Sequence, residues 1–379
     1  MSRTRIKAKS IAVNAITDRE LSSLVSQQVS NGGANKNIII NGAMNVAQRS
    51  TSVADLGNTN KTAAYLTLDR MYMNVGNTAG RLTMTQDSSG PSGFANSLKL
   101  DCTTADASIA SNEAVFLQTN FEGQNLQTLN KGTSSAVPVS VSFYVKGNAS
   151  ATYVCELYDY DNSRQISQTF NVTADWTRVE LTFVGDTTGA LGDDNGLSFA
   201  INIWLHAGSN STSGTLSTTW TSVTAANRAV GISSILDSTA RTFFITGWQM
   251  EIGQNATAFE HEPYDRTLVK CQRYYLEKSN VGGPFRADGY GGGGTTGGFV
   301  YDFPVAMRAA PTGTLTIGEA LSANNGSAAT TISGLNSCTT NPHGADINFT
   351  GVGSYTGAGL SFYCNAAGSK TAVHFNSEL

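Results

Sequence analysis

The residues that could carry chemistry in this sequence are few and lie far apart. Its four histidines are His206, His261, His343 and His374. No two of them have the i, i+4 spacing with which a helix presents two imidazoles to zinc. The sequence also lacks the Gly-x-Ser-x-Gly turn that exposes a serine nucleophile. We therefore expect no metal site, no cofactor and no nucleophilic catalysis.

Aspartates gather where turns are expected, and a glycan-cleaving enzyme would need two carboxylates flanking the scissile bond. They are Asp159, Asp161, Asp186, Asp193 and Asp194. Aspartate side chains accept hydrogen bonds from their own backbone in turns, and this explanation suffices for all five. The oxygen-rich segment 193–196 is also a candidate for a structural calcium ion. The sequence therefore favours a protein that is not an enzyme.

Aromatic side chains in polar surroundings are the remaining binding candidates, because a flat ring can pack against the C–H face of a sugar. Trp220 lies among serines and threonines, Tyr290 in a glycine-rich stretch and Tyr355 between two glycines. We interpret these three as glycan-binding candidates, with anchoring of their own loops as the alternative. Trp204 and Trp248 lie inside alternating strands, and we expect them in the core.

Composition excludes several classes of partner. Only 14% of the residues are charged, against roughly 25% in typical globular proteins, and the net charge is −4. Binding to nucleic acid needs a basic face that releases counterions, so we expect no nucleic-acid partner. No run of about 18 apolar residues occurs and no apolar signal-peptide core follows the first basic residues, so we expect no membrane insertion. The five cysteines lack Cys-x-x-Cys spacing and fit reduced thiols in a cytoplasm, with a Cys338–Cys364 bridge as the alternative.

The elements that must position these side chains are strands. Runs of five to eleven residues alternate between apolar and polar side chains, with Gly, Asn or Asp between the runs; they are 81–85, 97–102, 139–146, 152–158, 168–172, 177–183, 197–205 and 242–252. Ile38, Ile39 and Ile40 predict a further short buried strand. Period-2 strands separated by turn residues are typical of an antiparallel sandwich. We therefore predict an all-β fold with an antiparallel jelly-roll sandwich over residues 37–265.

Residues 266–379 predict a smaller C-terminal β domain. Helical spacing over 266–277 predicts a short connecting helix, although a strand around 274–276 stays open. The glycines of 289–298 predict a flexible hairpin loop. Short strands are expected around 299–303, 315–317, 360–364 and 372–375.

Residues 1–36 predict a short helical arm. Thr17 and Glu20 form a capping box, which starts a helix whose apolar residues follow at helical spacing. One apolar stripe on so short a helix needs a partner surface, because isolated helices below about 12–15 residues are marginal. Basic residues precede the helix. The docking candidates in this arm are Arg3, Arg5, Leu21, Leu24 and Val25.

Several stretches resemble tailed-bacteriophage tail-fibre and receptor-binding structural proteins that contain a carbohydrate-binding-module-like jelly roll. They are Asn37–Met44 with Gln48-Arg49, Leu68–Met71, Gly247–Gly253, Ala258–His261, Cys271–Tyr275, Phe303–Arg308, Ala310–Thr312 and Phe375–Leu379. The resemblance spans about 37–312 and the last few residues, and it carries over no catalytic residues. It implies a homotrimeric virion protein made in the host cytoplasm and located in the tail.

The leading hypothesis is a tail-fibre or spike subunit that is attached to other phage virion proteins through residues 1–36 and binds host-surface polysaccharide. Two alternatives stay open. One is an architectural component without receptor binding, such as a capsid decoration, a head fibre or a fibre adaptor. The other is a glycan depolymerase, which would need a carboxylate pair about 5–10 Å apart in a groove.

Overall fold

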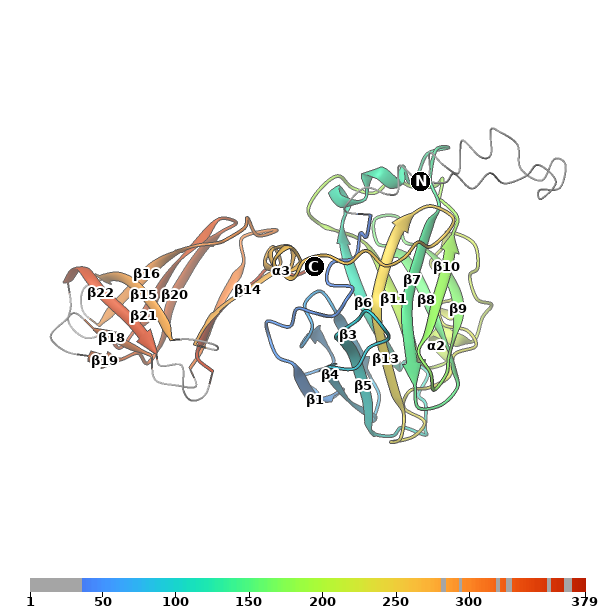
Figure 1. Cartoon of the computed structure of the whole chain (residues 1–379), viewed down its shortest axis with the longest axis horizontal. Coiled ribbons are helices and arrows are strands. Elements are labelled where there is room, and N and C mark those ends of the chain that lie inside the picture. Colours follow the sequence, from blue (N-terminus) through green and yellow to red (C-terminus); the bar gives the residue numbers. More distant parts are fainter. Residues whose placement is uncertain are drawn as a thin grey trace, which may run out of the picture.

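The computed structural model describes residues 36–280, 284–292, 295–317, 321–324, 329–352, 356–364 and 370–379. The described chain forms two β-rich bodies on either side of the short helix α3 (Tyr264–Gln272) (Figure 1). The prediction of an all-β, antiparallel fold is confirmed, since all the described strand pairs are antiparallel. The predicted N-terminal arm lies outside the described residues.

The larger body is a sandwich of two sheets. The six-stranded sheet has the order β1 (Ser52–Leu56), β4 (Arg81–Asp87), β5 (Ser97–Thr104), β13 (Thr242–Ile252), β7 (Val139–Gly147) and β10 (Thr177–Phe183). The seven-stranded sheet has the order β12 (Thr221–Ser222), β9 (Arg164–Val172), β8 (Ala151–Asp159), β11 (Leu197–Ala207), β6 (Ala114–Glu122), β3 (Tyr72–Gly76) and β2 (Ala63–Tyr65).

Alternation along the strands builds the core between these sheets, because successive side chains of a strand point to opposite faces. On β11, Ile201 and Ile203 are fully buried in the core, while Asn202 and Trp204 occupy the other face. A bulge in β13 at Gly247 aims Trp248 into the core: Gly247 has φ +61°, and a Cβ there would lie 2.8 Å from the ring of Phe94. This bulge therefore requires a glycine.

The smaller body has its own core between two further sheets. One has the order β14 (Tyr275–Ser279), β23 (Ala372–Asn376) and β17 (Thr312–Thr316). The other has the order β19 (Ala329–Thr331), β18 (Ser322–Asn324), β22 (Thr356–Cys364), β15 (Phe285–Gly292), β16 (Thr296–Asp302), β21 (Gly344–Thr350) and β20 (Gly334–Asn341). The boundary expected at residue 265 falls inside α3. All five cysteines are free thiols.

Two local predictions differ from the structure. Ile38–Ile40 form no strand: Ile38 donates one backbone hydrogen bond to Met250, and the chain then turns at Asn41, which has φ +62°.

Most of the predicted glycine loop is strand, in β15 and β16. The reason is close packing, because a Cβ at Gly298 would lie only 2.0 Å from the Ile347 carbonyl oxygen on the neighbouring strand.

The predicted connecting helix is also shorter than its expected range. It ends at Gln272, and the β-prone residues Tyr275 and Leu276 begin strand β14 instead. Both side chains are buried, and β14 pairs along its full length with β23. The strand alternative for this stretch is therefore the one that the structure adopts.

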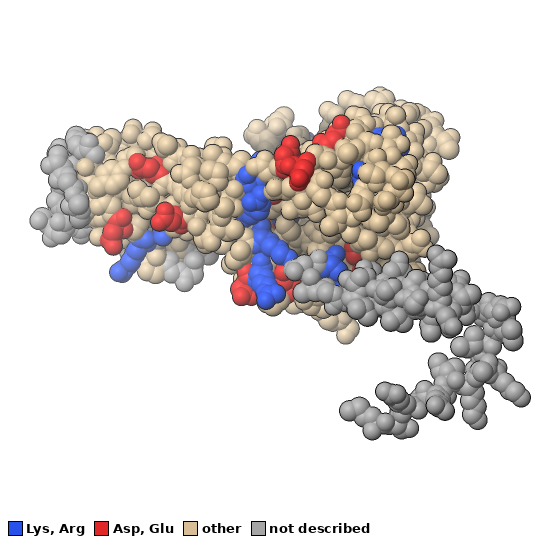
Figure 2. All heavy atoms as spheres, turned by 90° about the horizontal axis from the view of Figure 1, so that it is seen from above, with Lys and Arg blue, Asp and Glu red and all other residues tan. Residues whose placement is uncertain are grey.

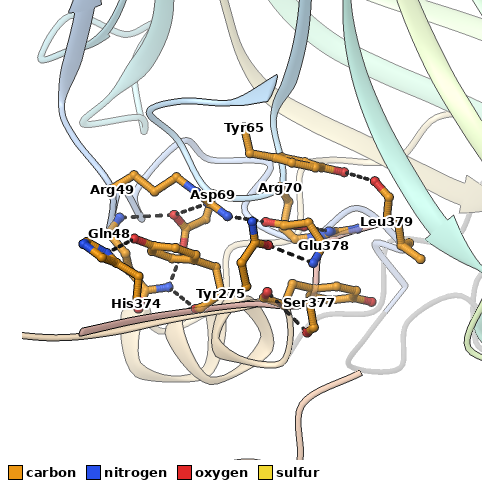
Figure 3. Close-up of polar contacts among 12 residues, drawn as sticks. Gln48, Arg49, Tyr65, Asp69, Arg70, Tyr275, His374, Ser377, Glu378 and Leu379 are labelled. Carbon is orange, nitrogen blue, oxygen red and sulfur yellow. Dashed lines mark hydrogen bonds and ion pairs between the residues drawn. The ribbon is translucent and has the colours of Figure 1, made fainter. Parts of the chain in front are cut away.

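Motif residues from distant parts of the chain meet where the two bodies join (Figure 3). The Glu378 carboxylate accepts a hydrogen bond from Arg49 Nη2 at 3.1 Å and pairs with Arg70 as well. The Arg49 guanidinium lies 3.6 Å from the centre of the Tyr275 ring, and that of Arg70 lies 3.5 Å from the centre of the Tyr274 ring. We call these five residues the latch, since they connect loops of the sandwich to the first and last residues of the smaller body.

Buried carboxylates flank the latch. Asp69 accepts hydrogen bonds from the backbone and side chain of Gln48, and burial raises its pKa to about 6. Glu122 accepts two hydrogen bonds from Arg273, at 2.8 and 2.6 Å, and one from the Tyr274 hydroxyl at 2.5 Å. These donors keep the pKa of the Glu122 carboxyl below its ordinary value although burial opposes that shift.

Candidate functional site

The outer face of the seven-stranded sheet carries mostly aromatic and amide side chains. Its members are Tyr72 of β3, Phe116 and Gln118 of β6, Tyr158 of β8, Tyr160 just after β8, Asn202 of β11, and Arg228 of the loop that follows β12. We call this set the aromatic face. Strand register brings it together, because Gln118 lies opposite Asn202 on β11 and opposite Tyr72 on β3.

A buried carboxylate organises this face. Glu156 on β8 is fully buried and accepts four hydrogen bonds: from Asn202 Nδ2 at 2.9 Å, Trp204 Nε1 at 2.8 Å, and Arg228 Nε and Nη2 at 2.8 and 2.9 Å. The paired guanidinium lies over two rings, 4.6 Å from the centre of Tyr158 and 5.0 Å from that of Trp204. Because its oxygens are occupied by four donors, Glu156 acts as a scaffold rather than as a free acid or base.

Tyr158 and Tyr160 form the open part of the aromatic face. Their ring centres are 4.6 Å apart and the planes are inclined by 56°. Tyr160 is 40% exposed, and its hydroxyl accepts a hydrogen bond of 2.8 Å from Gln118 Nε2. Burial raises the pKa of Tyr160, and also that of Tyr72, so both phenols keep their protons at neutral pH and can donate hydrogen bonds.

One acceptor on this face has no partner among the described residues, Asn202 Oδ1, although its residue is only 1% exposed. The amide cannot be turned to relieve this. Its Nδ2 donates to Glu156, which accepts only, so a flipped amide would set two acceptors against each other. A buried polar atom without a hydrogen bond costs about 1–3 kcal/mol.

A Ser-His-Glu grouping lies nearby, at the end of β11. The His206 ring contacts Ser234 Oγ through Nδ1 at 2.7 Å and Glu113 Oε2 through Nε2 at 2.8 Å. The other hydrogen bonds of Ser234 and Glu113 go to backbone N–H groups of loops. Ser234 Oγ accepts the Leu236 N–H at 3.0 Å, Glu113 Oε1 accepts the Ala110 N–H at 2.6 Å, and His206 is fully buried. We therefore assign the group to fastening two loops to the sheet.

The predicted aspartate cluster makes ion pairs and turns. Asp159 and Asp186 both contact Lys131 Nζ, at 2.5 and 3.1 Å, and Arg164 makes two hydrogen bonds to Asp186. Asp194 accepts the N–H of the residue two positions on. Over the described part of the chain, no three His, Cys, Asp or Glu side chains lie close enough together to hold a metal ion.

The three predicted glycan-binding residues do not come together. Trp220 donates its Nε1 proton to the Val184 carbonyl oxygen at 2.7 Å and packs against the sandwich core, so its contacts are those of a loop anchor. Tyr290 lies in the smaller body, where its hydroxyl donates to Asp346 at 2.5 Å. Tyr355 lies outside the described residues, as do the docking candidates Arg3, Arg5, Leu21, Leu24 and Val25. Glycan binding by these residues stays a prediction.

Sequence reasoning missed the aromatic face because it assigned Trp204 to the core. The indole is buried, but it belongs to a separate small cluster on the outer face of the sheet, in contact with Phe116 at a ring-centre distance of 4.9 Å. The alternation of β11 contained the signal. Asn202 and Trp204 share one face of that strand, and Ile201 and Ile203 share the other.

No protein-family model and no curated protein matches this sequence. Solved structures similar to it include a carbohydrate-binding module of family 4, with a TM-score of 0.29, 11% identity and coverage of 56% of this chain and 98% of that one. The xylan-binding domain CBM22-1 of Paenibacillus barcinonensis has a TM-score of 0.28 and 10% identity, with coverage of 59% and 100%. The enzymatically active domain of tailspike protein 4 from bacteriophage CBA120 has a TM-score of 0.30 and 11% identity, over 57% of this chain and 22% of that one.

Likenesses at these TM-scores carry no inference about function. No α-helix in the described ranges combines the length and the apolar character needed to span a bilayer.

Proposed function

We propose that this protein is a bacteriophage virion structural protein, without catalytic activity, that binds a host-surface glycan through the aromatic face of its sandwich. The observation that carries the binding role is that the ring pair of half-buried Tyr158 and exposed Tyr160 shares a sheet face with the buried, unpartnered acceptor Asn202 Oδ1. Sites for small polar ligands combine ring surfaces with a few fixed polar groups in this way. Support for the virion role comes from the motifs that resemble phage tail-fibre proteins.

Each part of the aromatic face has a role in this proposal. The Tyr158 and Tyr160 rings receive the C–H face of a sugar, and the phenolic protons and the Gln118 amide orient it. A sugar hydroxyl donates to Asn202 Oδ1. Such a site is weak by itself, and three copies in a homotrimer would raise avidity by about 10²–10⁴ when linked sites engage one surface together.

The test is binding of the full chain to arrays of bacterial surface polysaccharides. Tyr160→Ala removes one exposed ring, and we expect about tenfold weaker binding, because an aromatic contact contributes about 0.5–1.5 kcal/mol beyond area burial. Tyr264→Ala on α3 is the matched control, since Tyr264 is 56% exposed and lies apart from the aromatic face. Equal binding by the wild type and Tyr160→Ala would refute the assignment of the site.

The virion role has a separate test. Cryo-electron microscopy of intact particles should place the chain in the tail as a trimer, attached through residues 1–36, with the aromatic face open to solvent. A position on the head, or an aromatic face covered by neighbouring proteins, would instead support the architectural alternative. Shortening of a bound polysaccharide on incubation with the purified protein would contradict the absence of catalysis.

A further inference from the structure

A pocket of about 580 Å³ lies beside the latch, between the end of β6, residues 37–40 and helix α3. Pockets of roughly 300–1,000 Å³ are the size that small ligands occupy. The latch residues Arg70 and Tyr274 line it. In the view from above, Lys and Arg atoms form a band between the two bodies (Figure 2).

The pocket continues the aromatic face. Asn120, which lines the pocket, follows Gln118 by two residues on β6, so the two side chains share one face of that strand. Neighbouring residues of one strand face are about 7 Å apart, so the two side chains lie within the span of a short oligosaccharide. A chain of sugars on the aromatic face can therefore extend into the pocket.

Asn120 offers a second unpartnered acceptor. Its Oδ1 has no hydrogen-bond partner among the described residues, and the residue is only 5% exposed. The orientation of this amide is fixed as well. Nδ2 donates to the Tyr65 hydroxyl at 2.8 Å and to the Leu379 carbonyl oxygen at 3.3 Å, and that carbonyl can only accept. The pocket thus lacks a donor at Asn120, as the aromatic face does at Asn202.

The remaining polar groups of the pocket favour a negative charge. Its twelve described lining residues include three cations, Arg70, Lys270 and Arg273, and no carboxylate. Each cation is paired with an acid outside the lining. Lys270 is the most accessible: its side chain is 38% exposed, and its Nζ lies 2.7 Å from Glu262 Oε1. An ammonium has three N–H donors, so Lys270 can hold Glu262 and a ligand carboxylate together.

Apolar surface completes the lining, from Ile38, Ile40 and Phe121. We infer that this pocket binds a carboxylate-bearing sugar residue, so that the glycan recognised by the protein is an acidic polysaccharide. The sugar carboxylate is held by Lys270 and Arg273, a hydroxyl donates to Asn120 Oδ1, and the C–H face lies against the isoleucines. This inference rests on the proposed glycan binding and adds the class of glycan.

The experiment compares acidic polymers with their own neutral forms, using the full-length protein. The probes are polygalacturonate, hyaluronate and polysialic acid, each before and after chemical reduction of its carboxyl groups to alcohols. We expect at least one acidic polymer to bind about tenfold more tightly than its reduced form, which is the effect of one charge-assisted hydrogen bond. Lys270→Gln should abolish this preference, and Lys270→Arg should retain it.

Lys99→Gln is the matched control, because Lys99 pairs with Asp101 at 3.0 Å on the other sheet of the sandwich and should leave the preference unchanged. Equal binding of acidic and reduced polymers that Tyr160→Ala weakens equally would overturn the inference and leave the proposed function standing. A preference for acid that survives in Lys270→Gln would also overturn the inference. Failure of all polymers and of all arrayed bacterial polysaccharides to bind would overturn the proposed function, and the inference with it.

Discussion

The ion pair between Glu156 and Arg228 gives the sharpest test of how the aromatic face is built. The carboxylate is fully buried, and Arg228, whose side chain is 21% exposed, meets it through two hydrogen bonds. Removing one partner of a buried pair costs about 3–5 kcal/mol. Because water reaches part of Arg228, we expect the lower end, so Glu156→Gln should reduce the free energy of unfolding by about 3 kcal/mol.

A double-mutant cycle separates the pair from its surroundings. Glu156→Gln, Arg228→Met and the double variant are unfolded in urea while tryptophan fluorescence is followed, since Trp204 is a direct partner of Glu156. We expect a coupling energy of about 2 kcal/mol, within the range of about 0.5–3 kcal/mol found for residues that share one hydrogen-bond network.

The chain offers a matched control for this cycle. Arg241 and Asp237 make the same two-bond contact, at 2.6 and 2.7 Å, but the Asp237 side chain is 41% exposed. Exposed pairs contribute about 0.2–1 kcal/mol. A Glu156–Arg228 coupling no larger than that of Arg241→Met with Asp237→Asn would refute the scaffold role assigned to Glu156.

Three further predictions concern stability. Asp69 has a pKa of about 6 in the fold against an ordinary 3.8, so its ionisation disfavours the folded state above pH 6. In urea unfolding, the stability of the wild type relative to Asp69→Asn should therefore rise by about 1.4 kcal/mol as the pH is lowered from about 7 to about 5. A stability difference that falls or stays constant over this pH range would contradict the assigned pKa. Gly298→Ala should prevent pairing of β16 with β21 and expose the smaller body to limited proteolysis, whereas unchanged resistance would show that the strands can separate without loss. Trp220→Ala should lower the melting temperature while leaving glycan affinity within twofold, and lost affinity at unchanged stability would return Trp220 to the binding site.

Much of the sandwich could be predicted because alternation reports burial directly. Strands such as β4 and β10 have one face in the core and one face that is exposed or partly exposed, and their residues repeat with period 2. Strand β6 was not predicted although it pairs with both β11 and β3. Its first four residues are all apolar, and Gln118, Thr119 and Asn120 after them are polar although buried, so no period-2 alternation marks the strand.

The glycine-rich stretch misled prediction for a related reason. Glycine usually marks a turn, but in β15 and β16 it provides space between closely packed strands, and only the partner strand reveals that need. Likewise, the aromatic face depends on cross-strand register, which brings Glu156, Asn202 and Gln118 together from three strands. The residue pattern within a single strand does not predict these cross-strand contacts.

The latch has a consequence for how such a molecule can be altered. Three of its residues, Tyr274, Tyr275 and Glu378, flank the smaller body in the chain, and strands β14 and β23 pair between them as a stem. The segment from 280 to 371 is thus carried as a cassette between two strands that are already fixed to the sandwich. Exchanging that cassette for one of different sequence, with Arg308 and Lys370 kept because they also contact the sandwich, would alter what the far end of the molecule presents while the latch stayed in place.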